Sequence, residues 1–238
     1  MQDLRLFAVA GSSGAMTMNL AAQTRAAYER WAPLYPPTAH NPLMRAEQRA
    51  MARRWPQVSG SRALDLACGT GRYSRLLADG GAAQVVAVDF CMPMLQQVDA
   101  AARVCADMTL LPFAHDSFDV VVCGLALGHA SAVHAWMAEI SRVLRPGGTL
   151  LYSDFHPDAA LTGLPRSFRD RNERTWTVPH QRHDLNSQQD AATRTNLTIE
   201  LVHEVRVGVE LREPFANSEA FYRRWHGLPI VLVVRARK

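Results

Sequence analysis

The chain has 238 residues, of which 48% are hydrophobic and 20% are charged. These values exclude a wholly disordered chain and are typical of one domain that buries a sizeable core. The formal net charge is +4, and because Lys238 is the only lysine, arginine supplies the basic excess. Lysine-dependent phosphate loops and Schiff-base chemistry are therefore excluded from the body of the chain.

Neither a nucleic acid nor a membrane is expected as a partner. The basic residues do not alternate with aromatic residues, as they do on many surfaces that bind nucleic acids. No apolar run approaches the roughly 20 residues that a membrane-spanning helix needs. The four cysteines lack the C-x-x-C spacing of zinc and redox sites, so we expect reduced thiols, no metal and a cytoplasmic location.

The N-terminal part of the chain contains two predicted helices. Residues 1–18 lack the basic start and the cleavage site of a signal peptide, so we expect a disordered tail there. Leu20–Trp31 is predicted to be a helix that ends before Pro33, since proline cannot continue a helix. The pair Asn41-Pro42 suits the N-cap and first turn of a second helix. We assign residues 19–57 to an N-terminal helical cap.

Between residues 58 and 156 the pattern alternates between strand and helix. Each predicted strand is a short apolar run, and the helices end at glycine pairs. Such alternation predicts a parallel sheet that is covered by helices on both faces. The predicted strands are residues 62–67, Gln84–Asp89, a short strand ending at Asp107, Phe118–Cys123 and Thr149–Asp154, and the predicted helices include 72–79 and Val133–Leu144.

The remainder of the chain is predicted to complete the same domain. Residues 157–195 are polar and rich in arginine, histidine and glutamine, so we interpret them as a lid insertion. The alternation of valine with polar residues across Val205–Val209 predicts a half-buried antiparallel strand, and Leu228–Val234 predicts a last apolar strand. Because no linker or internal repeat interrupts the pattern, residues 19–238 are predicted to form a single domain, with C-terminal strands in 196–238.

The segment Ala63–Tyr73 has the pattern of a nucleotide-binding turn. Its apolar strand ends in Gly-x-Gly, and Gly69 and Gly71 allow a sharp turn and the close approach of a ligand. An NAD-binding fingerprint would place a third glycine at position 74, where this chain has Ser74. That fingerprint also has no counterpart for Asp65, the acid four residues before the first glycine. The segment therefore indicates a nucleotide pocket of another kind.

This pattern resembles motif I of the class I S-adenosylmethionine (SAM)-dependent methyltransferases. Asp89, at the end of the second predicted strand, is similar to the second motif of that family. The run Cys105–Asp119 resembles its D-x-x-x-L-P-F … F-D segment, and Glu139–Gly148 resembles its E-x-x-R-V-L-R-P-G-G segment. The resemblance covers about residues 20–155 and is closest to the small-molecule branch that includes quinone-ring and malonyl-carrier-protein ester methyltransferases.

The resemblance implies an α/β, Rossmann-like sheet of seven strands in the order 3-2-1-4-5-7-6, with an antiparallel last strand and helices on both faces. It also implies SAM as the methyl donor and S-adenosylhomocysteine as a product. Three acids, Asp65, Asp89 and Asp107, are expected to converge on the donor, with Asp89 accepting hydrogen bonds from the ribose hydroxyls. The expected cofactor-binding residues are Tyr35, Asp65, Ala67, Gly69, Thr70, Gly71, Asp89, Phe90, Met94, Asp107, Met108, Gly124 and Leu125.

Candidate acid–base residues lie beyond the fourth and fifth predicted strands, whose carboxyl ends face the pocket in an open α/β sheet. His129 is the first candidate for a catalytic base and His156 is the second, because an unperturbed histidine titrates near pH 6.5. For each histidine alone, a role in a loop or a helix cap is the alternative. Further substrate contacts are expected from Tyr28, Asp154, His180 and His183.

The sequence thus predicts methyl transfer from SAM to a small-molecule acceptor by in-line displacement. The methylated atom is left open between oxygen, nitrogen and carbon, and a base is needed only if the acceptor must lose a proton. Two alternatives are a SAM-binding protein without catalysis and an NAD-dependent oxidoreductase on a similar fold. The expected assembly is a monomer or a homodimer.

Overall fold

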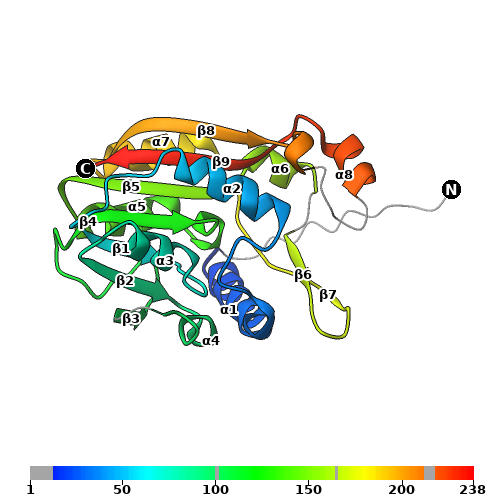
Figure 1. The fold of residues 1–238 in the computed structure, drawn as a ribbon, viewed down its shortest axis with the longest axis horizontal. Coiled ribbons are helices and arrows are strands. Elements are labelled where there is room, and N and C mark those ends of the chain that lie inside the picture. The colour runs from blue at the N-terminus through cyan, green and yellow to red at the C-terminus, as the bar shows by residue number, and fades with distance from the viewer. Residues whose placement is uncertain (1–12, 100–101, 164–165, 212–217) are drawn as a thin grey trace.

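A seven-stranded sheet forms the middle of the protein (Figure 1). The computed structural model describes residues 13–99, 102–163, 166–211 and 218–238. The strand order is β3-β2-β1-β4-β5-β9-β8, in which β9 runs antiparallel to both neighbours and the other pairs are parallel. The strands are β1 Arg62–Leu66, β2 Gln84–Asp89, β3 Ala102–Cys105, β4 Phe118–Gly124, β5 Leu144–Phe155, β8 Thr198–Arg206 and β9 Pro229–Arg237.

This topology confirms the predicted fold class and strand order. The numbers 9 and 8 replace the predicted 7 and 6 because a small hairpin, β6 Ser167–Arg169 and β7 Thr175–Thr177, precedes them in the chain. The central strands β1 and β4 are buried along almost their whole length, which explains why they are apolar runs without alternation. The predicted strand across Val205–Val209 is wrong at both ends, since β8 begins at Thr198 and stops at Arg206, and Val209 lies in the 3-10 turn η3 Val209–Leu211.

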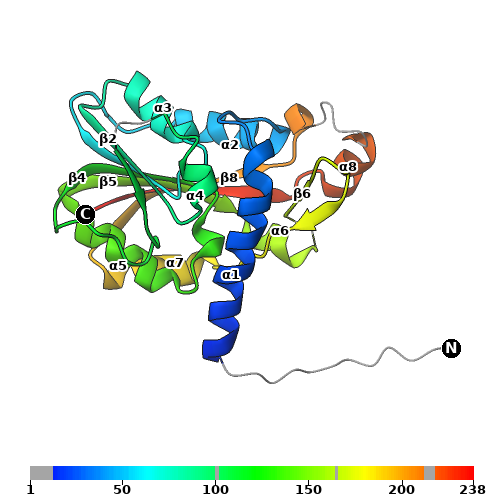
Figure 2. The ribbon, with the colours of Figure 1, turned by 90° about the horizontal axis from the view of Figure 1, so that it is seen from below.

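Helices cover the two faces of the sheet. α2 Pro42–Ala52 and α3 Arg72–Asp79 lie on one face, and α5 Val133–Val143 and α7 Leu185–Arg194 lie on the other (Figure 2). The predicted N-cap is confirmed, because the side chain of Asn41 accepts a 2.8 Å hydrogen bond from the N–H of Met44. The remaining short elements are η1 Ala32–Leu34, α4 Met92–Leu95, η2 Leu127–His129, α6 Pro157–Leu161 and α8 Ser218–Trp225.

The long helix α1, Ser13–Trp31, crosses beside α4, between the sheet and the β6–β7 hairpin (Figure 2). The expected tail at residues 1–18 is therefore wrong for its last part, because residues 13–18 belong to this helix, and residues 1–12 lie outside the described residues. The segment interpreted as a lid, 157–195, also contains α7, which packs against α5 on the sheet. No helix in the described ranges combines the length and apolarity that a bilayer crossing requires.

A buried polar cluster around Glu47 joins α2 to the sheet. The Glu47 carboxylate is fully buried and forms a 2.7 Å ion pair with Arg72 at the start of α3. It also accepts hydrogen bonds from the hydroxyls of Tyr73 at 2.6 Å and Ser153 at 2.5 Å. One carboxylate thus connects α2, α3 and β5 beside the carboxyl ends of the central strands.

Candidate active site

The turn between β1 and α3 contains three residues with a left-handed backbone. Ala67, Gly69 and Gly71 have φ angles of 54°, 56° and 86°. A Cβ on Gly71 would lie 2.8 Å from Cγ1 of Val98, so both the backbone conformation and the packing require glycine there. Ala67 adopts a conformation that glycine adopts with less strain. The turn therefore exposes backbone atoms, with small or no side chains, at the edge of the sheet where the parallel strands have their carboxyl ends.

A pocket at this edge is lined by the turn, the ends of β2 and β4, helix α1 and Arg166. All but two of the predicted cofactor residues line it, and the exceptions are Asp65 and Gly71. The pocket thus collects side chains from segments that are far apart in the sequence. The predicted residues in the lining are Tyr35, Ala67, Gly69, Thr70, Asp89, Phe90, Met94, Asp107, Met108, Gly124 and Leu125.

Two carboxylates face the pocket. Asp89, the last residue of β2, accepts hydrogen bonds from the N–H of Gly69 and the N–H of Cys91, each at 2.8 Å. Each of its oxygens keeps a further lone pair that can accept a bond from a ligand hydroxyl. Asp107 lies two residues beyond the end of β3, and its Oδ1 accepts bonds from the N–H and the hydroxyl of Thr109. Both acids are therefore positioned by groups of the protein itself.

Asp65 does not line the pocket, contrary to the prediction that three carboxylates converge there. Its side chain is buried and accepts a 2.6 Å hydrogen bond from the hydroxyl of Ser74 on α3. Burial raises the pKa of this carboxyl to about 7. Asp65 thus connects the strand before the turn to the helix after it, which is a positioning role.

His129 in η2 is the predicted base that lines the pocket. Its Nδ1 lies 3.2 Å from the carbonyl oxygen of Pro179, and its Nε2 lies 3.0 Å from the hydroxyl oxygen of Tyr28. A carbonyl can only accept, so Nδ1 carries the hydrogen and Nε2 accepts from Tyr28. Burial, and then the positive charge of Arg166, hold the pKa of His129 well below 6.5. The imidazole is therefore neutral at neutral pH.

The other predicted acid–base and substrate residues, apart from Tyr28, lie outside the pocket lining. His156 caps α6, where its Nδ1 accepts a 3.1 Å hydrogen bond from the N–H of Asp158. His183 contacts a backbone carbonyl through Nε2 at 3.0 Å, and the ring of His180 packs edge-on against an aromatic ring. Burial raises the pKa of Asp154 to about 6. The capping alternative thus describes His156 better than a catalytic role does.

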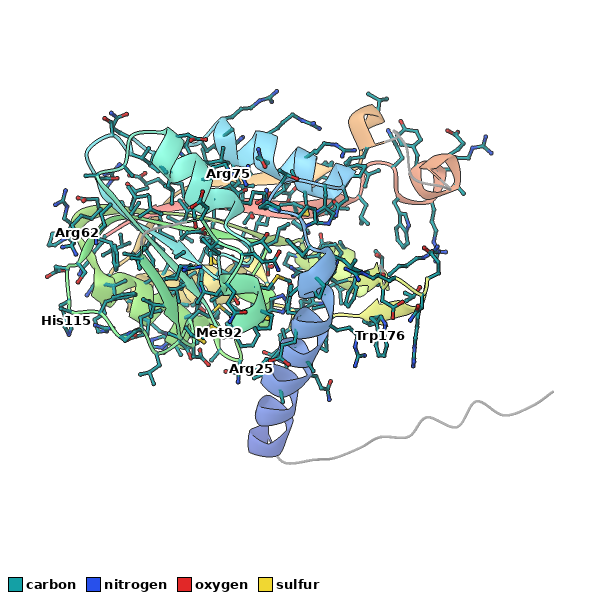
Figure 3. All side chains as sticks on the ribbon, turned by 60° about the horizontal axis from the view of Figure 1, so that its bottom comes forward. Arg25, Arg62, Arg75, Met92, His115 and Trp176 are labelled. Atoms are coloured by element: carbon teal, nitrogen blue, oxygen red, sulfur yellow. The ribbon has the colours of Figure 1, made fainter. Side chains whose placement is uncertain are left out.

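Helix α1 and the segment around the β6–β7 hairpin meet beside the pocket. Trp31 stacks on Phe168, with ring centroids 4.5 Å apart and an interplanar angle of 5°. The guanidinium of Arg30 lies 3.7 Å from the ring centroid of Trp176, which projects from the hairpin near α1 (Figure 3). At the other side of the helix, Arg25 reaches over the ring of Phe90 near α4 (Figure 3). These contacts hold the pocket-lining helix between the hairpin and the sheet.

Sequence reasoning missed several lining residues, of which Arg166 and Arg72 are the charged ones. Arg72 directly follows the glycine turn, so its position in the chain is a signal that could have identified it. Arg166 lies in a polar segment without periodicity, and no motif in the sequence marks it. Its place in the pocket depends on contacts with Tyr28 and Leu125, which are far away in the sequence.

The chain resembles known methyltransferases in sequence. A family described as a methyltransferase domain matches residues 64–152. A malonyl-[acyl-carrier protein] O-methyltransferase from Enterobacter lignolyticus is 31% identical over 207 residues, which cover 85% of this chain and 77% of that protein. The chain belongs to the class I SAM-dependent methyltransferases. It is therefore an enzyme whose methyl donor is SAM, as the motifs predicted.

Two further relatives support this assignment. A demethylmenaquinone methyltransferase from Renibacterium salmoninarum is 40% identical over 119 residues, which cover 44% of this chain and 49% of that protein. This match thus spans about half of the relative. The crystal structure of a SAM-dependent methyltransferase from Mesorhizobium loti has a TM-score of 0.66 and 26% identity, and the alignment covers 81% of this chain and 98% of that one. The same fold therefore extends over most of this methyltransferase.

The residues of the pocket fit SAM. Apart from its two chain neighbours, a Cβ on Gly69 would meet no atom of the described residues within 4 Å although this residue lines the pocket, so the turn leaves space for a ligand. Asp89 offers free lone pairs to hydroxyl groups, and Phe90 and Met94 supply apolar surface for a planar base. When bound, SAM supplies a methyl group that its sulfonium already activates.

Gly69→Ala is expected to weaken SAM binding at least about tenfold, because the added methyl group enters the space at the turn. Gly60→Ala is the matched control: Gly60 also has a positive φ, 73°, a Cβ there also meets nothing within 4 Å, and it does not line the pocket. Both variants bear a similar backbone strain of roughly 1–2 kcal/mol. Calorimetric titration with SAM measures both, and equal affinities would contradict the placement of the ligand against Gly69.

Proposed function

We propose that this methyltransferase acts on a small molecule that must lose a proton, and that Tyr28 and His129 accept it. The contact that carries this proposal is the 3.0 Å approach of the Tyr28 hydroxyl oxygen to Nε2 of His129. Both residues line the same pocket as the glycine turn and Asp89. The acid–base pair and the predicted donor site therefore share one enclosure, and methyl and acceptor can be held in line there.

The proton moves through two groups of this chain. As the acceptor gives its proton to the Tyr28 oxygen, the Tyr28 proton passes to Nε2 of His129, and the carbonyl of Pro179 holds the opposite ring nitrogen. Nη2 of Arg166 donates a 3.2 Å hydrogen bond to the same Tyr28 oxygen. The guanidinium thus stabilises the negative charge that develops on this oxygen during the transfer.

His129→Ala is expected to lower turnover by about 100-fold or more, the usual contribution of general acid–base catalysis. The affinity for SAM should change less than about threefold, because the carboxylates and the turn remain. Transfer of tritium-labelled methyl groups to a panel of phenols, amines and carboxylic acids measures turnover. A rate within threefold of wild type would contradict the proposed base.

His156→Ala is the matched control, since it removes an imidazole that lies outside the pocket lining. Its turnover should stay close to wild type.

The pH profile gives a further check on the wild-type enzyme. Only the neutral imidazole accepts a proton, and its pKa lies well below 6.5, so turnover should stay constant as the pH falls from about 8 to about 6.5.

A further inference from the structure

Arg166 places a partly unsatisfied guanidinium in the pocket. Its Nη2 donates hydrogen bonds to the backbone carbonyl of Leu125 and to the hydroxyl of Tyr28. Its Nη1 is buried and has no hydrogen-bond partner among the residues that the structure describes. A buried donor without a partner costs on the order of 1–3 kcal/mol, and a charged donor costs more. A ligand that supplies an acceptor would remove this cost.

The guanidinium of Arg166 also forms no direct ion pair with a described residue, although its charge acts on the nearby buried carboxyl of Asp154. Within the described ranges, no carboxylate oxygen lies within 4.0 Å of its guanidinium. Arg72, the other arginine of the lining, differs in this respect because it pairs with Glu47 at 2.7 Å. Since a guanidinium stays protonated in proteins, Arg166 carries a permanent positive charge that can bind an anion.

We infer that Arg166 binds a carboxylate of the methyl acceptor, so that the acceptor is a small organic acid with its methylated atom near the acidic group. This inference rests on the proposed function. The planar guanidinium matches a carboxylate in geometry, and Nη1 is the atom still able to donate. Because Nη2 already contacts Tyr28, the bound carboxylate lies close to the Tyr28–His129 pair. The anion would thereby orient the acceptor toward the proton-accepting groups.

The donor also carries a carboxylate, on its methionine portion, and Arg72 could hold that group through nitrogens other than Nη1, the atom that contacts Glu47 and Gln48. Arg72 directly follows the glycine turn and lines the pocket next to it. Arg166 instead contacts Tyr28 on α1, on the side of the acid–base pair. Arg72 thus lies at the side of the pocket next to the glycine turn, and Arg166 lies at the side next to Tyr28. We therefore assign Arg166 to the acceptor.

The test compares benzoate with benzamide as probes, because the two have the same shape and differ in charge. Each is titrated into the full-length protein, with and without S-adenosylhomocysteine, and binding is followed by nuclear magnetic resonance. Wild type should bind benzoate at least about tenfold more tightly than benzamide. Arg166→Gln should remove this preference, and Arg166→Lys, which keeps the charge and loses the planar fork, should retain part of it.

Arg169→Gln is the control for a general change in charge, since Arg169 pairs with Glu173 and does not line the pocket. It should leave the preference for benzoate intact. Equal binding of the two probes to wild type, or no binding of benzoate, would overturn the inference. So would a preference that persists in both Arg166 variants. The titration measures binding and not turnover, with and without S-adenosylhomocysteine. Its result therefore tests Arg166 even if His129 proves not to act in the reaction.

A further pair of ligands distinguishes the acceptor from the donor as the source of the carboxylate. 5′-Methylthioadenosine lacks the amino acid portion of S-adenosylhomocysteine, including its carboxylate. If Arg166 served the donor, Arg166→Gln would weaken S-adenosylhomocysteine and leave 5′-methylthioadenosine unaffected, which would overturn the assignment. We expect Arg166→Gln to change the affinities for S-adenosylhomocysteine and for 5′-methylthioadenosine less than about threefold.

Discussion

Glu47→Ala is expected to lower the free energy of unfolding by about 3–5 kcal/mol, the usual range when one partner of a buried ion pair is removed. Glu47 is fully buried and accepts from Arg72, Tyr73 and Ser153 at once. Its removal leaves the guanidinium of Arg72 largely buried without its carboxylate, and it leaves two hydroxyls without their acceptor. The loss of stability should therefore exceed the cost of removing a side chain that leaves no buried partner unpaired.

Urea unfolding measures this loss, with Glu200→Ala as the matched control. Glu200 also pairs with two arginines, Arg235 and Arg237, but its side chain is 26% exposed. Such solvent-accessible pairs contribute about 0–1 kcal/mol, so this variant should unfold close to wild type. A similar loss in both variants would contradict a special role for the buried cluster. Since Arg72 and Tyr73 line the pocket, Glu47 also links the stability of the fold to the shape of the site.

The parts of the fold that were predictable from the sequence depend on local chemistry. The strand Gln84–Asp89 has the predicted bounds because its middle residues, Val85–Val88, form an apolar run that ends at the acid Asp89. The helix over 72–79 also has its predicted bounds, since a glycine precedes it and a glycine follows it. The glycine turn could be recognised because its φ angles demand small residues. In each case the residues that determine the structure are neighbours in the chain.

The parts that were not predictable depend on contacts between distant segments. The motif around Asp65 shows that an acid is present but not which way its side chain turns, and the bond to Ser74 decides that. Arg166 enters the pocket because an irregular segment packs against Tyr28, 138 residues earlier in the chain. The histidines illustrate the same limit, since His129 and His156 both follow strands and only His129 lines the pocket.

Asp89→Asn is expected to weaken SAM binding by about 100-fold. Hydrogen bonds to charged groups contribute roughly 1.5–3 kcal/mol, and about 1.4 kcal/mol corresponds to tenfold in affinity. The amide that replaces one oxygen would also face the N–H of Gly69 or of Cys91, donor against donor. The substitution therefore removes an acceptor for the ribose and displaces the turn that approaches the ligand. Calorimetric titration with SAM and with S-adenosylhomocysteine gives the affinities.

Asp65→Asn is the matched control, because it makes the same chemical change on the neighbouring strand β1. An asparagine there keeps an oxygen for the hydroxyl of Ser74, and the residue lies outside the pocket lining. Its affinity for SAM should stay within about threefold of wild type. An equal loss in the two variants would mean that Asp65 turns toward the donor when SAM binds. A loss confined to Asp89→Asn would show that the acid at the end of β2 contacts the ligand, while the acid of motif I positions the turn.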